Sequence, residues 1–203
     1  MIPNHYACTA CQEIFKFASR DAVYYVNGGA EPLANRVAGR DLIHVPVRPG
    51  WCKDCGGVCL VEDIASLRAF ENAYGAVRAG GRVEYPVEST GMSAQEAELS
   101  LAAYLRWRMG RRHVARALCC GRSNFQLLDV AQPLLKHQEC EFGFVEPRII
   151  LSGYNGPGPG IYSAADIPVY SGEGELMGRL TWRERSSDTW AVVPAAYSKL
   201  AET

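Results

Sequence analysis

The sequence predicts an α+β protein with an N-terminal four-cysteine module, two amphipathic helices and a C-terminal antiparallel β-sheet. Two C-x-x-C pairs lie in the first 60 residues, and two later segments repeat apolar residues at helical spacing. Short β-prone runs dominate after residue 124. We expect three segments that pack as one compact unit. They cover residues 1–61, 62–123 and 124–203.

The composition is that of an ordinary globular chain. Of its 203 residues, 48% are hydrophobic and 21% are charged, which excludes disordered, collagenous and coiled-coil chains. No apolar run approaches the roughly 20 residues that cross a bilayer, and no basic stretch precedes an apolar one at the N-terminus. We therefore expect a cytoplasmic protein without a membrane partner. A net charge of −1 excludes bulk electrostatic attraction to nucleic acid.

The first 60 residues alternate between cysteine turns and strands. Residues 22–26 are β-prone, and Asn27-Gly28 supplies a turn with positive φ. Residues 41–47 form the next expected strand, in which Pro46 indicates an edge or an end.

A first helix is expected from Glu62 to the Gly80-Gly81 pair. Glu62 and Asp63 would occupy its first turn, where acidic side chains favour the helix dipole. Five apolar residues then form one stripe at three- and four-residue steps. They are Ile64, Leu67, Phe70, Tyr74 and Val77. A short strand is expected at 83–87.

A second helix is expected to begin after Ser93. Ser93 and Glu96 match a capping box, in which each side chain binds a backbone N–H of the other residue. Gly110 would end or bend the helix. Its buried face would comprise Ala97, Leu101, Tyr104 and Leu105.

The C-terminal segment reads as strands and loops. Residues 186–188 would form the turn of a terminal hairpin, and the Gly-Pro-rich residues 152–160 an exposed loop. The expected strands are 148–151, 167–170, 176–182 and 189–193.

Four cysteines predict one structural zinc site. Cys8 and Cys11, like Cys52 and Cys55, are separated by two residues, so that a tight turn can aim both sulfurs at one ion. In a reducing compartment, paired C-x-x-C turns favour metal over disulfides. This zinc-ribbon-like module would bind one Zn²⁺ through all four sulfurs. Unliganded buried thiols are an alternative.

A thiol-disulfide oxidoreductase acting through Cys52 and Cys55 is another alternative, because Trp51-Cys52-Lys53-Asp54-Cys55 resembles the W-C-x-x-C motif of thioredoxins. That motif requires a helix after the first cysteine. The residues that follow here begin with Gly56-Gly57, which disfavours a helix.

A second cluster resembles half of a cysteine turn. Cys119, Cys120 and Gly121 match the end of a C-x-x-C-G motif, but Ala117 stands at its first cysteine position. His137 and Cys140 have ligand-like spacing. We expect these thiols to pack as small apolar groups, and a second zinc site is the alternative. Cys59, within an apolar run, is expected in the core.

The whole layout resembles small bacterial zinc-ribbon proteins, and through them immunity or accessory proteins of polymorphic-toxin systems. The resemblance rests on the Cys8/Cys11 and Cys52/Cys55 turns and on the partial motif at 118–121. It implies a protein that binds a cognate bacterial toxin or effector and blocks it.

Recognisable catalytic motifs do not occur in the sequence. It lacks a G-x-S-x-G elbow, an H-E-x-x-H pair and a G-x-x-x-x-G-K loop. A zinc ion closed by four thiolates has no open position for a substrate. We therefore predict a non-enzymatic protein-binding module.

Aromatic residues on expected loops and edges are the predicted partner-binding anchors. They are Tyr154, Tyr162, Trp182 and Trp190. Burial in the core is the alternative for these side chains. Acidic residues in the C-terminal segment could face a basic partner. They are Glu139, Glu141, Glu146, Glu173 and Glu175.

A basic cluster near the end of the second helix indicates an alternative function, nucleic-acid binding by a zinc-ribbon regulator. Its arginines could contact phosphates, and its tryptophan could stack on a base. The members are Arg106, Trp107, Arg111, Arg112 and Arg116. A solvated helix end, where arginines favour the dipole, is the competing interpretation.

Overall fold

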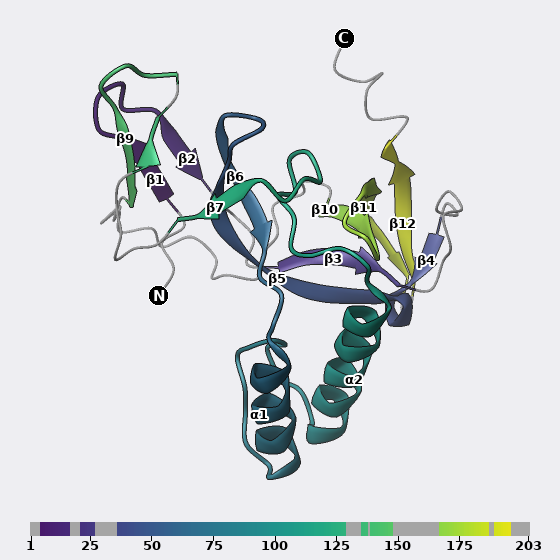
Figure 1. Cartoon of the computed structure of the whole chain (residues 1–203). Coiled ribbons are helices and arrows are strands. Elements are labelled where there is room, and N and C mark those ends of the chain that lie inside the picture. The colour runs from purple at the N-terminus through teal and green to yellow at the C-terminus, as the bar shows by residue number, and fades with distance from the viewer. Residues whose placement is uncertain are drawn as a thin grey trace, which may run out of the picture. The chain divides into compact units, whose positions relative to one another are not determined.

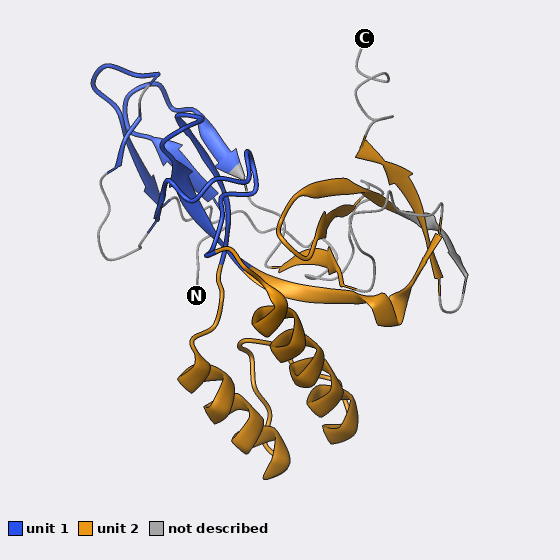
Figure 2. Cartoon of the chain, turned by 45° about the vertical axis from the view of Figure 1, so that its right-hand side comes forward, with its two compact units in different colours: residues 1–20, 47–62, 114–162 blue, residues 21–46, 63–113, 163–203 orange. Residues whose placement is uncertain are grey.

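The computed structural model describes residues 5–16, 21–26, 36–128, 135–137, 139–147, 167–186 and 189–195. The chain forms two compact units, each assembled from three separate stretches (Figure 2). The cysteine unit contains residues 1–20, 47–62 and 114–162; the helical unit contains residues 21–46, 63–113 and 163–203. This differs from the three consecutive segments expected, because strands distant in sequence pair with one another. Two helices and mostly antiparallel strands among the described residues confirm the α+β class (Figure 1).

The cysteine unit contains a four-stranded antiparallel sheet in the order β2-β1-β9-β8. Its strands are β1 (His5–Cys8), β2 (Ile14–Lys16), β8 (Leu135–Lys136) and β9 (Phe144–Pro147). One face of this sheet packs into an apolar cluster. The buried members of that cluster are Tyr6, Trp51, Leu128 and Val145.

The long strand β5 (Leu42–Cys52) passes from the helical unit into the cysteine unit. Residues 42–46 pair with β3 (Asp21–Tyr25), and residues 47–52 pair with β6 (Gly57–Glu62). Pro46 therefore stands where the partner strand changes, which explains how a proline without an N–H is accommodated in the strand. The last three residues of β5 also pair with β7 (Phe125–Leu127).

The helical unit holds the remaining strands, in the order β4-β12-β11-β10-β3-β5. All neighbours are antiparallel except β10 and β3. The strands not yet given are β4 (Arg36–Ala38), β10 (Ile167–Ser171), β11 (Leu176–Ser186) and β12 (Thr189–Pro194), and a short 3₁₀ helix covers Gly39–Asp41. The core of this sheet contains Val23, Val37, Val169, Leu180 and Val192. The three expected C-terminal strands from 167 onward are confirmed, and the expected strand at 148–151 lies outside the described residues.

The two helices lie in the helical unit and differ from prediction at one end. Helix α2 (Ala94–Gly110) begins as expected: the Ser93 side chain accepts from the Glu96 N–H, and the Glu96 carboxylate accepts from the Ser93 N–H. Helix α1 (Leu67–Arg78) begins five residues later than expected, capped by Ser66. Glu62 instead ends strand β6, and the strand expected at 83–87 does not form.

Each helix buries one stripe of residues spaced three or four apart. On α1 these are Phe70, Ala73 and Val77. On α2 they are Ala97, Leu101, Tyr104 and Trp107. The Tyr74 hydroxyl joins the helices by donating to Glu98 at 2.7 Å. Neither these helices nor any other in the described part of the chain could cross a membrane.

Candidate metal centres

Among the residues that the structure describes, seven cysteines and His137 of the cysteine unit gather into two groups of four, not the single group predicted. The Cys₃His group contains Cys8, Cys11, His137 and Cys140, and the Cys₄ group contains Cys52, Cys55, Cys119 and Cys120. Within each group, one ligand atom from every residue lies within 4.8 Å of the others. The expected pairing of the Cys8 turn with the Cys52 turn is therefore corrected, because each turn meets a later segment of the chain.

The first cysteine turn follows strand β1. The Gln12 N–H donates to the Cys8 carbonyl at 3.1 Å, and Gln12 adopts a left-handed φ of 62°. Backbone N–H groups of Cys11 and Ala10 donate to the Cys8 sulfur. Burial opposes ionisation, but these hydrogen bonds lower the pKa of the Cys8 thiol to about 6. The turn thus favours the thiolate form that a metal ion requires.

A glycine brings the second half of the Cys₃His group close to the first. His137 follows β8, and its N–H donates to the Gly143 carbonyl at 2.8 Å. A Cβ atom added to Gly143 would lie 2.1 Å from the Cys8 sulfur and 2.9 Å from the Cys140 sulfur. Any larger residue at position 143 would therefore occupy the space that these two sulfurs need.

The His137 ring is fixed between the thiols and a carboxylate. Its side chain is buried, with Nδ1 3.5 Å from the Cys11 sulfur and Nε2 3.4 Å from a Glu13 oxygen. The rings of Phe15 and Trp51 meet it edge to face, at centroid distances of 5.6 and 6.2 Å. A carboxylate that accepts a hydrogen bond from one ring nitrogen of a histidine fixes the tautomer of the ring. The other ring nitrogen then carries the lone pair that can bind a metal ion. Here Glu13 would leave the Nδ1 lone pair of His137 directed toward the thiols.

The Cys₄ group begins with the same kind of turn. The Gly56 N–H donates to the Cys52 carbonyl at 2.9 Å, and Gly56 has φ of 68°. Burial raises the pKa of the Cys52 thiol, but hydrogen bonds from the Cys55 N–H and from the Cys120 thiol lower it overall. The Cys52 and Cys120 sulfurs lie 3.5 Å apart.

The third turn confirms the half-motif noted in the sequence. The Gly121 N–H donates to the Ala117 carbonyl at 2.8 Å, and Gly121 has φ of 71°, as in the two complete turns. Ala117 is fully buried at the position that a first cysteine would hold. Cys119, next to Cys120, supplies the fourth sulfur instead.

Cys59 lies beside the Cys₄ group but outside it. It is buried in an apolar cluster with Cys52, Val61 and Ala117, which confirms its expected core position. Burial raises the pKa of its thiol to about 11, so that Cys59 remains protonated near neutrality.

The predicted aromatic anchors receive little support as binding residues. Tyr154 and Tyr162 lie outside the described residues, and so does the side chain of Trp182. Trp190 is half-buried and packs against the valine-rich core of the helical unit.

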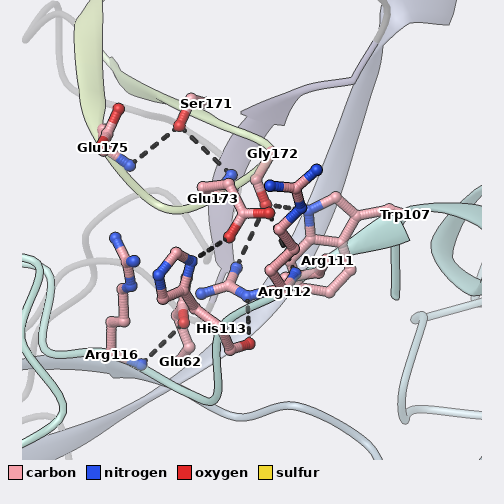
Figure 3. A network of polar contacts seen from close by, with 10 residues as sticks. All are labelled: Glu62, Trp107, Arg111, Arg112, His113, Arg116, Ser171, Gly172, Glu173 and Glu175. Carbon is pink, nitrogen blue, oxygen red and sulfur yellow. Dashed lines mark hydrogen bonds and ion pairs between the residues drawn. The ribbon is translucent and has the colours of Figure 1, made fainter. Parts of the chain in front are cut away.

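Two members of the predicted basic cluster have structural roles (Figure 3). Trp107 is buried, and its indole N–H donates to the Gly172 carbonyl at 2.8 Å. Arg111 is also buried; it stacks over the Trp107 ring and donates to the Gly172 and His113 carbonyls. These two side chains hold the turn between β10 and β11, so that Trp107 does not have the exposed position predicted for base stacking.

The other arginines of the cluster differ in exposure. Arg106 and Arg112 are exposed, and Arg116 is half-buried in the cysteine unit. The Arg112 N–H donates to Glu173, whose carboxylate also contacts His113. The Arg116 N–H donates to the buried Glu62 carboxylate at 2.8 Å. Figure 3 shows these contacts.

Comparison with protein-family models, with curated proteins and with solved structures finds no significant match. The chemistry of the two groups therefore rests on their own residues. Seven thiolate sulfurs and one imidazole nitrogen are ligands of the kinds that bind zinc in tetrahedral sites. Sequence reasoning missed Glu13 and Gly143. The H-x-x-C spacing before Gly143 was the signal that could have drawn attention to it.

Proposed function

We propose that this chain is a non-enzymatic protein-binding module stabilised by two structural zinc ions. The observation that carries the proposal is that both groups offer a full set of four ligands. A tetrahedral ion held by four side chains has no open position for water or substrate, whereas catalytic zinc sites keep one. The Cys₃His and Cys₄ sets are also the sets typical of structural zinc.

Zinc binding would also make the cysteine unit more acidic. Seven thiolates contribute −7 and two divalent ions +4, which would change the formal net charge of the chain from −1 to −4. Metal ions without an open coordination position favour a binding role over catalysis, and a negative net charge favours a basic protein partner. The partner class that we favour is a bacterial toxin or effector that this chain blocks as an immunity, inhibitor or accessory protein.

Metal stoichiometry tests the structural part of the proposal. The purified chain should contain two zinc ions by elemental analysis. Cys11→Ser and Cys55→Ser should each reduce this to one ion, because they disrupt different groups. The assignment would be contradicted if either single variant lost both ions, or if the wild-type chain contained no zinc.

Affinity capture tests the binding part. The tagged, zinc-loaded chain, isolated from its native cell, should retain one protein in stoichiometric amount. A Cys11→Ser, Cys55→Ser double variant serves as the control for captured material that does not depend on the folded cysteine unit. Recovery of nucleic acid without protein would favour the alternative function.

The two alternatives have weaker support. For nucleic-acid binding, Arg106 and Arg112 are exposed and could contact phosphates. Trp107 and Arg111, however, are hydrogen-bonded to the Gly172 carbonyl inside the helical unit. A redox role for Cys52 and Cys55 would require a free thiol pair, and both residues belong to the Cys₄ group.

A further inference from the structure

Cys59 lies on strand β6, beside the third cysteine turn. On the same strand, Val61 forms an antiparallel bridge with Ala117, and backbone hydrogen bonds of 2.8 and 3.1 Å flank the bridge. A bridge flanked in this way is a non-hydrogen-bonded pair, whose Cα atoms lie about 4.5 Å apart. Cys59 stands two residues before Val61. Cys119 stands two residues after Ala117, so the register of the bridge brings the two cysteines to the same side.

The side chains of these two cysteines meet. The Cys119 thiol is hydrogen-bonded to the Cys59 sulfur, although Cys119 itself lies in a turn and not in the strand ladder. Cys59 also packs in one buried cluster with Ala117, on the side that the register predicts. A disulfide requires Cα atoms about 4.4–6.8 Å apart, a range that includes the spacing of non-hydrogen-bonded pairs. The contact therefore places Cys59 and Cys119 within reach of a disulfide bond.

The two thiols differ in access and in coordination. Cys119 is exposed, whereas Cys59 is only 8% exposed. All eight cysteines lie among the described residues, and Cys59 is the one that belongs to neither ligand group. A four-coordinate ion would therefore engage Cys119 and leave the Cys59 S–H uncoordinated. An oxidant that arrives from solvent can reach Cys119, and the uncoordinated thiol in contact with Cys119 is Cys59.

We infer that Cys59 and Cys119 form a hydroperoxide-sensitive disulfide site whose closure releases the ion of the Cys₄ group. This inference rests on the metal centres of the proposed function and adds a means of regulating one of them. Cys119 is the thiol that the peroxide oxidises, and Cys59 is the thiol that resolves the oxidised product.

The reaction proceeds in two steps. In the first, the Cys119 thiolate attacks one oxygen of hydrogen peroxide and the O–O bond breaks, which gives a sulfenic acid and hydroxide. In the second, the Cys59 sulfur attacks the Cys119 sulfur, so that the S–S bond forms and the S–O bond breaks. The leaving hydroxyl takes the Cys59 proton and departs as water. The two sulfurs together give up two electrons, which reduce the peroxide, and a solvent proton converts the hydroxide to a second water.

Disulfide formation would remove one of the four ligands from the ion. Cys52, Cys55 and Cys120 would remain, and an ion with three protein ligands has an open position that a chelator can occupy. The Cys₃His group provides an internal comparison, because none of the eight cysteines is left uncoordinated beside it. We therefore expect peroxide to release one of the two ions selectively.

The test treats the zinc-loaded, full-length chain with a small molar excess of hydrogen peroxide. Remaining thiols are then alkylated, and the peptides are mapped by mass spectrometry. The expected product is a disulfide between the peptides that carry Cys59 and Cys119. A chromogenic chelator should detect one zinc ion released per chain, and a thiol reductant should restore its binding. In Cys11→Ser, which would retain only the ion of the Cys₄ group, the same treatment should release that ion.

The variant Cys59→Ala isolates the contribution of the uncoordinated thiol. Because Cys59 is not a ligand, this variant should contain two zinc ions before oxidation. It should then release zinc about tenfold more slowly than the wild type and retain Cys119 as a sulfenic acid that dimedone traps. Val58→Ala is the matched control, because it removes volume from the neighbouring half-buried position and leaves every thiol in place. It should release zinc at the wild-type rate.

The outcomes distinguish this inference from the proposed function. The disulfide site would be overturned if Cys59 were still alkylated after peroxide treatment of the wild type, or if two ligand cysteines were joined instead. Equal rates of zinc release from Cys59→Ala and the wild type would also overturn it. Two zinc ions in the untreated chain would in those cases leave the metal centres of the proposed function intact. A chain without zinc would contradict the proposed function, and the disulfide map would still decide whether Cys59 and Cys119 pair.

Discussion

The most direct test of the Cys₃His geometry is the substitution Gly143→Ala. A Cβ at this position would lie 2.1 Å from the Cys8 sulfur, and real Cβ atoms essentially never approach another heavy atom closer than 3.0 Å. The sulfur or the turn must therefore move by roughly 1 Å, which is a large fraction of a Zn–S bond of about 2.3 Å. We expect the variant to lose the Cys8–metal bond while its backbone hydrogen bonds remain possible.

The size of the effect follows from the metal-binding free energy. Structural zinc binds with an apparent 10–16 kcal/mol, so one of four ligands accounts for about 3 kcal/mol if they share it equally. This corresponds to an affinity for one zinc ion that is about 100-fold lower. Competition with a chromogenic chelator would measure it.

Gly57→Ala provides the matched control for Gly143→Ala. It lies in the same unit, and an added Cβ there would have no atom within 4 Å. Gly57→Ala should retain both ions at wild-type affinity. If Gly143→Ala also retained both ions at that affinity, the close approach of the Cys8 and Cys140 turns would be refuted.

Three further predictions concern other residues. Glu13→Gln should weaken zinc binding at the Cys₃His group by about tenfold, measured by the same competition, because Glu13 orients the His137 ring. Arg111→Ala should lower the free energy of unfolding by about 2–3 kcal/mol in urea titration, because it removes the stacking of the buried guanidinium on Trp107 and its hydrogen bonds to the His113 and Gly172 carbonyls, whereas exposed Arg112→Ala should cost under about 0.5 kcal/mol. In the metal-free chain, ultraviolet absorbance should report one thiolate forming near pH 6, and Cys8→Ser should abolish it. Since the pKa of Cys8 is lowered on folding, its ionisation stabilises the fold at higher pH, and this contribution is lost as pH falls through about 6.

Local geometry was predictable from the sequence, and the meeting of distant segments was not. The C-x-x-C turns, the half-motif at Gly121 and the Ser93 capping box each depend on five or fewer neighbouring residues. The pairing of the cysteine turns depends on strand register: β1 lies beside β9, which brings Cys8 to Cys140 rather than to Cys52. Spacing in the sequence carries no information about that choice.

Helix α1 shows a second limit of sequence reasoning. Glu62 and Asp63 match the acidic first turn of a helix, yet strand pairing continues until Glu62, which lies opposite Val47. The buried Glu62 carboxylate accepts a backbone hydrogen bond from Arg116, a residue 54 positions away. A tertiary contact of this kind overrides the local preference and delays the start of the helix to Leu67.

The two ligand groups are nested along the chain, with consequences for biosynthesis. Cys52 and Cys120 are separated by 68 positions in the sequence, and that interval lies wholly inside the 126 positions that separate Cys11 from His137. During translation the inner pair of turns is complete first, whereas Cys8 and Cys11 must wait until His137 has left the ribosome. Closing the inner loop shortens the outer separation of 126 positions by 68, to 58, and each halving of loop length lowers the closure cost by about 0.6 kcal/mol. The first ion acquired would therefore ease capture of the second.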